Sequence, residues 1–129
     1  MRRIINTLLH NGITAPAVSV STLTEDFQHL SLLIFAIGAT ANIKVKVSNS
    51  DVVNFAAAST VTNRWYYVDM KGLGDGAATV VGTTGLALTL ATSQRGYAVN
   101  VDEAKWVAVD VEALSAGSVS VSLTGATNN

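Results

Sequence analysis

The sequence predicts an all-β fold: an antiparallel β-sandwich, jelly-roll-like, with an extended N-terminal arm. Seven or eight short segments have strand-like patterns, and turn-forming residues separate them, with little sign of helix. The hydrophobic content of 49% comes largely from Ala and Val, whereas aromatic residues make up only 6%. A chain of 129 residues with this composition fits one domain whose core consists of thin, β-branched layers.

Residues 1–26 are predicted to form the arm, and residues 27–129 a single sandwich domain. The arm holds one candidate strand, residues 17–23, which follows the only proline of the chain, Pro16. Two placements of the arm are open. Either it packs on a neighbouring subunit, or it folds back over an edge of its own sheet, where it would block unwanted strand pairing.

Two β-hairpins are predicted, each built from two strands and a turn of small residues. In the first, the continuous apolar run 30–37 is followed by a turn at 38–41 and by the strictly alternating run 42–48. In the second, residues 106–123 alternate on both sides of a turn at 115–118, whose glycine can take the positive φ of a tight turn. Both hairpins would be part of the same β-sandwich.

The stretch between the hairpins is predicted to hold a loop, an aromatic strand and several short strands. Residues 48–51 have the composition of a loop, and residues 52–58 fit either one helical turn or an irregular connection. The aromatic strand follows, and the remaining short strands precede the second hairpin. The predicted strands are residues 64–70, 78–81, 85–90 and 97–101.

Charged residues are few and nearly balanced, at 13% of the chain with a formal net charge of −1 at pH 7. We therefore expect no partner among nucleic acids or membranes, because both are recruited by a positive field. The chain contains no cysteine, so neither a disulfide nor a thiolate metal site can form. The apolar stretch near the N-terminus is short and interrupted, so we expect a soluble protein without export.

Two patterns that could indicate a cofactor are weak. The glycine-rich run 72–76 is followed by a strand-like segment, whereas a phosphate cradle needs the N-terminus of a helix. Four scattered carboxylates lack the dense spacing of a calcium loop and are typical of solvated turns. These carboxylates are Asp69, Asp75, Asp102 and Glu103. We therefore expect no cofactor and no metal.

A catalytic constellation is not apparent either. The two histidines, His10 and His29, stand outside any serine or cysteine arrangement that would make a triad. Asp110 and Glu112 share one strand face, which could suit acid/base work in a carbohydrate cleft, but such a pair more often wets an outer face. We expect that the chain is not an enzyme.

Aromatic side chains offer one candidate binding surface. Trp65, Tyr67 and Trp106 could stack on sugars, because aromatic rings combine a flat apolar face with a polar edge. Trp65 and Tyr67 would share one side of a strand, and Tyr66 would point to the other. The alternative role of these rings is packing in the core or against a subunit.

The order of these elements resembles small β-sandwich virion structural proteins of tailed bacteriophages. The resemblance covers roughly residues 28–124 and is carried by the order of the apolar strand, residues 42–48, 63–68 and 72–85, and Trp106 followed by residues 115–119. It implies a capsid decoration or cement protein in the virion, typically a trimer, whose partners are the major capsid protein or other virion proteins. The same resemblance fits a tail or fibre component.

In that role, the arm would supply the assembly contact. Its apolar residues would pack on a neighbouring subunit and its arginines would pair with carboxylates of the shell. The candidate contact residues are Arg2, Arg3, Ile4, Ile5, Leu8 and Leu9. The leading hypothesis is a non-enzymatic phage structural protein that stabilises the head by bridging subunits; the alternatives are a tail or fibre component and a carbohydrate-binding β-sandwich module.

Overall fold

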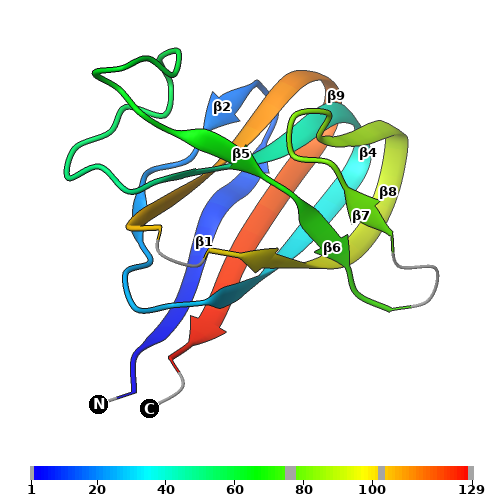
Figure 1. Ribbon diagram of the computed structural model, residues 1–129. Helices are drawn as coiled ribbons and strands as arrows, with labels where there is room; N and C mark the ends of the chain where they lie inside the picture. Colours follow the sequence, from blue (N-terminus) through cyan, green and yellow to red (C-terminus); the bar gives the residue numbers. More distant parts are fainter. Residues whose placement is uncertain (1, 75–77, 102–103, 128–129) are drawn as a thin grey trace.

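The computed structural model describes residues 2–74, 78–101 and 104–127, and over these ranges the chain is all-β (Figure 1). Every strand pairing is antiparallel, which confirms the predicted fold class. The strands are β1 (Ile4–Ile13), β2 (Ala17–Val18), β3 (Thr22–Leu23), β4 (His29–Ser48), β5 (Tyr66–Val68), β6 (Met70–Gly72), β7 (Thr79–Val80), β8 (Leu86–Asn100) and β9 (Trp106–Ala126). Within the described ranges, no helix is long and apolar enough to cross a membrane.

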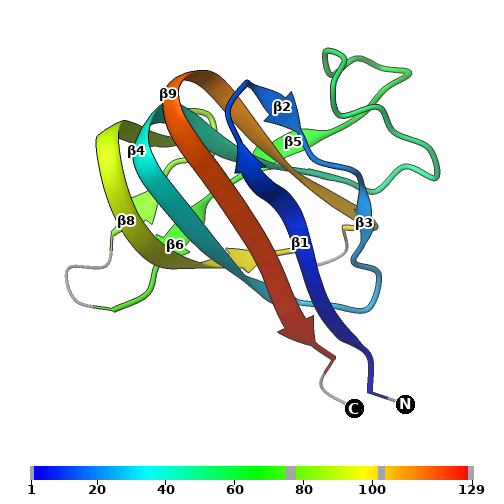
Figure 2. The ribbon, with the colours of Figure 1, turned by 180° about the vertical axis from the view of Figure 1, so that it is seen from behind.

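The long strands β4 and β9 bend and so contribute to both layers of the sandwich (Figures 1 and 2). The sheet order is β1-β9-β4-β8-β6-β7, with β2 and β3 also paired to β9 and β5 to β4. In the first layer, residues 29–37 of β4 lie between β9 and β8. In the second layer, residues 42–48 of β4 pair with residues 106–112 of β9 and with β5. This order does not test the jelly-roll-like connectivity, which stays a prediction.

Both predicted hairpins are wrong, because each pair of predicted strands is one bent strand. The register of β4 against β9 shifts between Ile37 and Asn42, where Gly38 has a φ of 56°. On β9, Ala113 and Gly117 have φ values of 51° and 71°. Extra residues and positive φ at these points make β-bulges, which bend a strand and increase its twist without reversing it.

β8 follows the same bend, and its path corrects a second prediction. The two short strands expected at 85–90 and 97–101 form one strand, which pairs with β4 on both sides of the bend. Its bend lies at Leu90, a non-glycine residue with a φ of 45°. The neighbouring strands therefore bend together, and their pairing shifts register at the bend and resumes in the other layer.

The core lies between the two layers and consists mainly of β-branched and leucine side chains. The alternation predicted for residues 42–48 and 106–123 is confirmed, since the apolar members of both runs point inward. The fully buried leucine, isoleucine and valine residues of β4 and β9 are Leu30, Leu32, Ile34, Ile43, Val45, Val47, Val107, Val109, Val111, Val119, Val121 and Leu123. The aromatic members of the core cluster are Phe27 and Tyr97, and Tyr97 lies on β8.

The N-terminal segment folds back along its own chain, one of the two placements expected. β1 pairs with the second half of β9, from Ile4 opposite Ala126 to Ile13 opposite Val119. The expected strand 17–23 is divided into β2 and β3, which pair with the first half of β9. The start of β1 and the end of β9 lie side by side in both views, and beyond them the amide of Thr127 donates to the carbonyl of Arg3 (Figures 1 and 2).

The segment between β4 and β6 departs from the prediction in two ways. Residues 52–58 form no helical turn but part of an irregular loop, the green trace at the upper left of Figure 1. The aromatic strand predicted at 64–70 is divided into β5 and β6 at Asp69. The Asp69 carboxylate accepts a hydrogen bond from the amide of Gly82, which bonds the strand break to the turn before β8.

The bend predicts that Gly117→Ala lowers the free energy of unfolding by about 3 kcal/mol. An added Cβ would overlap the carbonyl oxygens of Ile37 and Gly38 as well as strain the positive φ. Gly12→Ala is the matched control, because Gly12 has a φ of 58° but open space around its Cα, and should cost about 1 kcal/mol. Urea unfolding of both variants measures the difference, and equal losses would contradict the crowding at the bend.

Candidate functional site

The outer face of the second layer carries two ion pairs. Lys44 and Lys46 on β4 and Asp110 and Glu112 on β9 alternate with the core valines, so their side chains point away from the core. The amino group of Lys46 lies 3.0 Å from Oδ2 of Asp110, and that of Lys44 lies 3.1 Å from Oε2 of Glu112. Each lysine therefore pairs diagonally across the strands, because Lys44 is the residue directly opposite Asp110.

The Lys46–Asp110 pair is covered by the irregular loop of residues 49–65. Lys46 is only 5% exposed and Asp110 only 8%. The amino group of Lys46 also donates to the carbonyl of Phe55 at 2.9 Å. Phe55 and Ala108 are buried yet lie outside the main core cluster, so the loop closes a second, small buried region. The sequence interpretation of Asp110 as a wetted outer residue is wrong, because this loop covers it.

Two of the three aromatic residues considered as a sugar platform lie over these lysines. The rings of Trp65 and Tyr67 meet edge to face with centroids 5.0 Å apart. The Lys46 amino group lies 4.2 Å from the centroid of Trp65, and the Lys44 amino group lies 5.0 Å from that of Tyr67. Their shared side of the strand was predicted correctly, but a lysine of the same chain occupies one face of each ring.

Trp106 is the first residue of β9 and is not part of this edge-to-face pair. It stands opposite Ser48 on β4 and opposite Leu23 on β3, and its side chain is half-buried. Its indole Nε1 is buried and has no hydrogen-bond partner in the part of the chain that the structure describes. Among the described residues, the ring contact joins Trp65 and Tyr67 without Trp106, and stacking of sugars on any of the three stays a prediction.

Side-chain hydrogen bonds fix the loop of residues 49–65 in place. Asn54 and Asn63 bond reciprocally, since the Asn63 side chain accepts from the Asn54 amide and donates to the Asn54 carbonyl, both at 2.8 Å. The Ser59 hydroxyl donates to the carbonyl of Trp65 at 2.6 Å. The Ser48 hydroxyl donates to the carbonyl of Arg64 at 2.5 Å. These bonds preorganise the segment that leads into β5.

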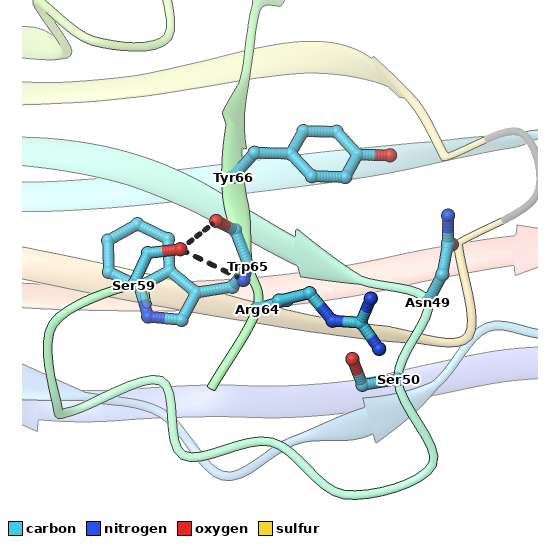
Figure 3. A pocket seen from close by; sticks show the side chains of 6 residues that line it. All are labelled: Asn49, Ser50, Ser59, Arg64, Trp65 and Tyr66. Carbon is cyan, nitrogen blue, oxygen red and sulfur yellow. Dashed lines mark hydrogen bonds between the residues drawn. The ribbon is translucent and has the colours of Figure 1, made fainter. Parts of the chain in front are cut away.

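A hollow of about 410 Å³ lies where this loop meets β5 (Figure 3). The side chains of Arg64 and Tyr66 extend on one side of the chain toward the hollow, while Trp65 points to the other side. Asn49 and Ser50 form the opposite wall. Sequence reasoning missed Arg64 and Tyr66, although the alternation that places Trp65 and Tyr67 together also places these two residues together.

A second hollow, of about 530 Å³, lies between residues 25–28 and the start of the same loop. At its rim the Lys105 amino group lies 2.9 Å from a carboxylate oxygen of Asp51. The hydrogen bond and the charge of Lys105 lower the pKa of the Asp51 carboxyl, and Asp51 in turn raises the pKa of Lys105. This exposed ion pair joins the start of the loop to the residue that precedes β9.

The candidate assembly residues divide between two sides of β1. Ile5 and Leu9 are half-buried and pack against the core, whereas Ile4 and Leu8 point outward and are 72% and 54% exposed. Arg2 is exposed. The guanidinium of Arg3 donates to the carbonyl of Glu25, approaches the Asp26 carboxylate at 3.5 Å and lies over the ring of Phe27.

The outward residues of β1 continue into a broad face of the first layer, which we name the serine face. On β9, Ser118, Ser120 and Ser122 lie directly opposite residues 33–37 of β4 and opposite Leu8 of β1. None of the residues in 4–9, 30–37 and 118–126 is charged. The serine face comprises Ile4, Leu8, Leu33, Phe35, Ile37, Ser118, Ser120 and Ser122.

Within residues 2–74, 78–101 and 104–127, no three His, Asp or Glu side chains gather as they would around a metal ion. His10 is buried and its Nε2 donates to the carbonyl of Val109 at 2.8 Å, whereas His29 is exposed at the start of β4. Three of the four carboxylates considered for calcium lie outside the described residues. They are Asp75, Asp102 and Glu103.

The chain shares its fold with two solved structures of phage-related proteins. The SPBc2 prophage-derived protein YomS superposes with a TM-score of 0.71 at 12% identity, over 98% of this chain and 96% of YomS. The PBSX exported protein XepA superposes with a TM-score of 0.67 at 15% identity, over 98% of this chain and 38% of XepA. Neither a protein family profile nor a curated protein sequence matches the chain. At these identities the likeness establishes the fold.

The covered ion pair predicts that Lys46→Met lowers the free energy of unfolding by about 3–5 kcal/mol, because Asp110 would stay buried without its partner. Lys46→Met combined with Asp110→Leu should recover most of the loss. Lys44→Met is the matched control and should cost about 1 kcal/mol, since its partner Glu112 is more exposed. Chemical denaturation of the wild type, the two single variants and the double variant measures these losses, and equal effects of Lys46→Met and Lys44→Met would contradict the role of burial.

Proposed function

We propose that the chain is a non-enzymatic structural protein of a phage particle, a capsid decoration or cement protein that stabilises the head by bridging subunits. The observation that carries the proposal is the serine face, an uncharged surface spread over β1, β9 and β4. The shared fold with two prophage-derived proteins, YomS and XepA, supports the phage association.

The composition of the serine face suits contact with another protein. The central parts of protein interfaces are depleted in charged residues and enriched in large apolar side chains. Here a ladder of three serines is flanked by exposed apolar residues on both neighbouring strands. On β1 these are Ile4 and Leu8, and on β4 they are Phe35 and Ile37, which are 43% and 66% exposed. An apolar rim around short hydroxyl side chains lets a partner approach closely and still find hydrogen bonds.

The arrangement of β1 sharpens the arm hypothesis. β1 is the outermost strand of the sheet order, and Ile5 and Leu9 attach it to the core. The assembly contact of a head protein would therefore use the outward residues Ile4 and Leu8 together with β4, rather than a detached arm. A tail or fibre component is the second candidate, because the same surface would serve any neighbouring virion protein.

The proposal predicts that Leu8→Glu combined with Phe35→Glu lowers the number of copies on purified phage particles about ten-fold or more, because it places two charges in an apolar contact. Val20→Glu is the matched control, since Val20 is 77% exposed but belongs to the segment between β2 and β3. Both variants should fold, as each replaces an exposed side chain. Quantitative mass spectrometry of particles grown with each variant provides the measurement, and equal copy numbers would overturn the role of the serine face.

A capsid bridge of this class is also expected to be a trimer. Native mass spectrometry of the purified protein should then give three times the chain mass of 13.4 kDa. A monomer at micromolar concentration would contradict the trimer and favour an independent binding module. Immunogold labelling of intact particles separates a head position from a tail or fibre position.

A further inference from the structure

We propose that the hollow between Arg64 and Tyr66 binds a sugar that carries an anionic group. Six residues line the hollow, and among them Ser59 and Trp65 are already bonded to each other. Asn49, Ser50, Arg64 and Tyr66 make no side-chain hydrogen bond or ion pair with the residues that the structure describes. Four unpaired polar groups around one hollow provide both charge and hydrogen-bonding capacity for a ligand.

The aromatic side chain indicates a sugar. Tyr66 is 48% exposed, and its ring lies along the hollow (Figure 3). A tyrosine offers a flat apolar face for the C–H side of a sugar ring and a hydroxyl for its edge. Tyr66 differs in this respect from Trp65, whose ring is covered by Lys46 and whose Nε1 donates to the carbonyl of Ala57. The available aromatic surface is therefore on the Tyr66 side of the chain.

The unpaired guanidinium of Arg64 indicates that the sugar carries an anionic group. A guanidinium presents a planar fork of donors that matches the two oxygens of a carboxylate or phosphate. The acidic residue of the loop, Asp51, is already paired with Lys105 at 2.9 Å. Asn49 and Ser50 approach from the wall opposite Arg64, where an amide and a hydroxyl suit sugar hydroxyl groups (Figure 3).

The fixed loop makes the hollow a preformed site. The hydroxyl of Ser48 holds the carbonyl of Arg64, and Tyr66 pairs in register with Val47 on β4. The backbones on either side of Trp65 are thus bonded to the sheet before any ligand arrives. A binding site held in this way loses little conformational entropy when the ligand binds. The volume of about 410 Å³ lies in the usual range of small-molecule sites.

The experiment is a titration of the full-length protein, followed by amide chemical shifts in solution NMR. The probes are 3′-sialyllactose for a carboxylate sugar, glucose 1-phosphate for a phosphate sugar, lactose for a neutral sugar and inorganic phosphate for the anion alone. We expect saturable shifts at Asn49, Ser50, Arg64 and Tyr66 with one or both anionic sugars, and which of the two binds identifies the source of the charge. Lactose and inorganic phosphate should bind about ten-fold more weakly or not at all.

Three variants test the assigned roles. Arg64→Gln and Tyr66→Ala should each raise the Kd of the anionic sugar about ten-fold or more, whereas Tyr66→Phe, which keeps the ring, should stay within about three-fold. Arg95→Gln is the matched control, because Arg95 is exposed on β8 and does not line the hollow.

Several outcomes would overturn the proposal. They are the absence of binding with all four probes, equal binding of lactose, an affinity for inorganic phosphate equal to that for glucose 1-phosphate, and undiminished binding by Arg64→Gln. None of these outcomes bears on the serine face, which lies on the other layer, so the proposed structural role is tested separately.

Discussion

The bends of β4 and β9 are the constraint on which the rest of the structure depends. Each strand crosses from one layer of the sandwich to the other without leaving the sheet, so backbone hydrogen bonds link the layers as well as side-chain packing. The bends require positive φ at Gly38 and Gly117, and close approach of the two strands at Gly117. The register on each side of the bend then decides which residues point to the core and which point outward.

The two outer faces have opposite chemistry. The serine face of the first layer is uncharged and open, whereas the second layer gathers Lys44, Lys46, Asp110 and Glu112. Burial of a charged pair is costly unless additional hydrogen bonds compensate the lost hydration. The carbonyl of Phe55 and the ring of Trp65 supply these contacts to Lys46, which positions the loop of residues 49–65 over the pair. The second layer is therefore covered in part by the chain's own loop, whereas large apolar side chains of the serine face stay exposed.

The sequence was sufficient to predict which residues of the strands face the core. It was not sufficient to predict whether successive strand-like runs are joined by a turn or by a bend. Alternation correctly placed Ile43, Val45 and Val47 in the core, because period-2 patterning depends only on local geometry. The runs 38–41 and 115–118 were misread as turns, because a small residue with positive φ serves both a tight turn and a β-bulge. Only the register with neighbouring strands distinguishes the two, and that register is set by contacts distant in the sequence.

The ion pair and the hollow were also only partly predictable from the sequence. Residues 64–67 connect the two. Alternation alone predicted that Trp65 and Tyr67 share a side of the strand. Their contacts with Lys46 and Lys44 on β4 depend on the register between β4 and β5, which the sequence does not show. Because Trp65 is held over Lys46, its neighbours Arg64 and Tyr66 must extend to the opposite side, where the hollow lies. The buried ion pair thus helps to position Arg64 and Tyr66, because it holds Lys46 under the ring of Trp65, the residue between them.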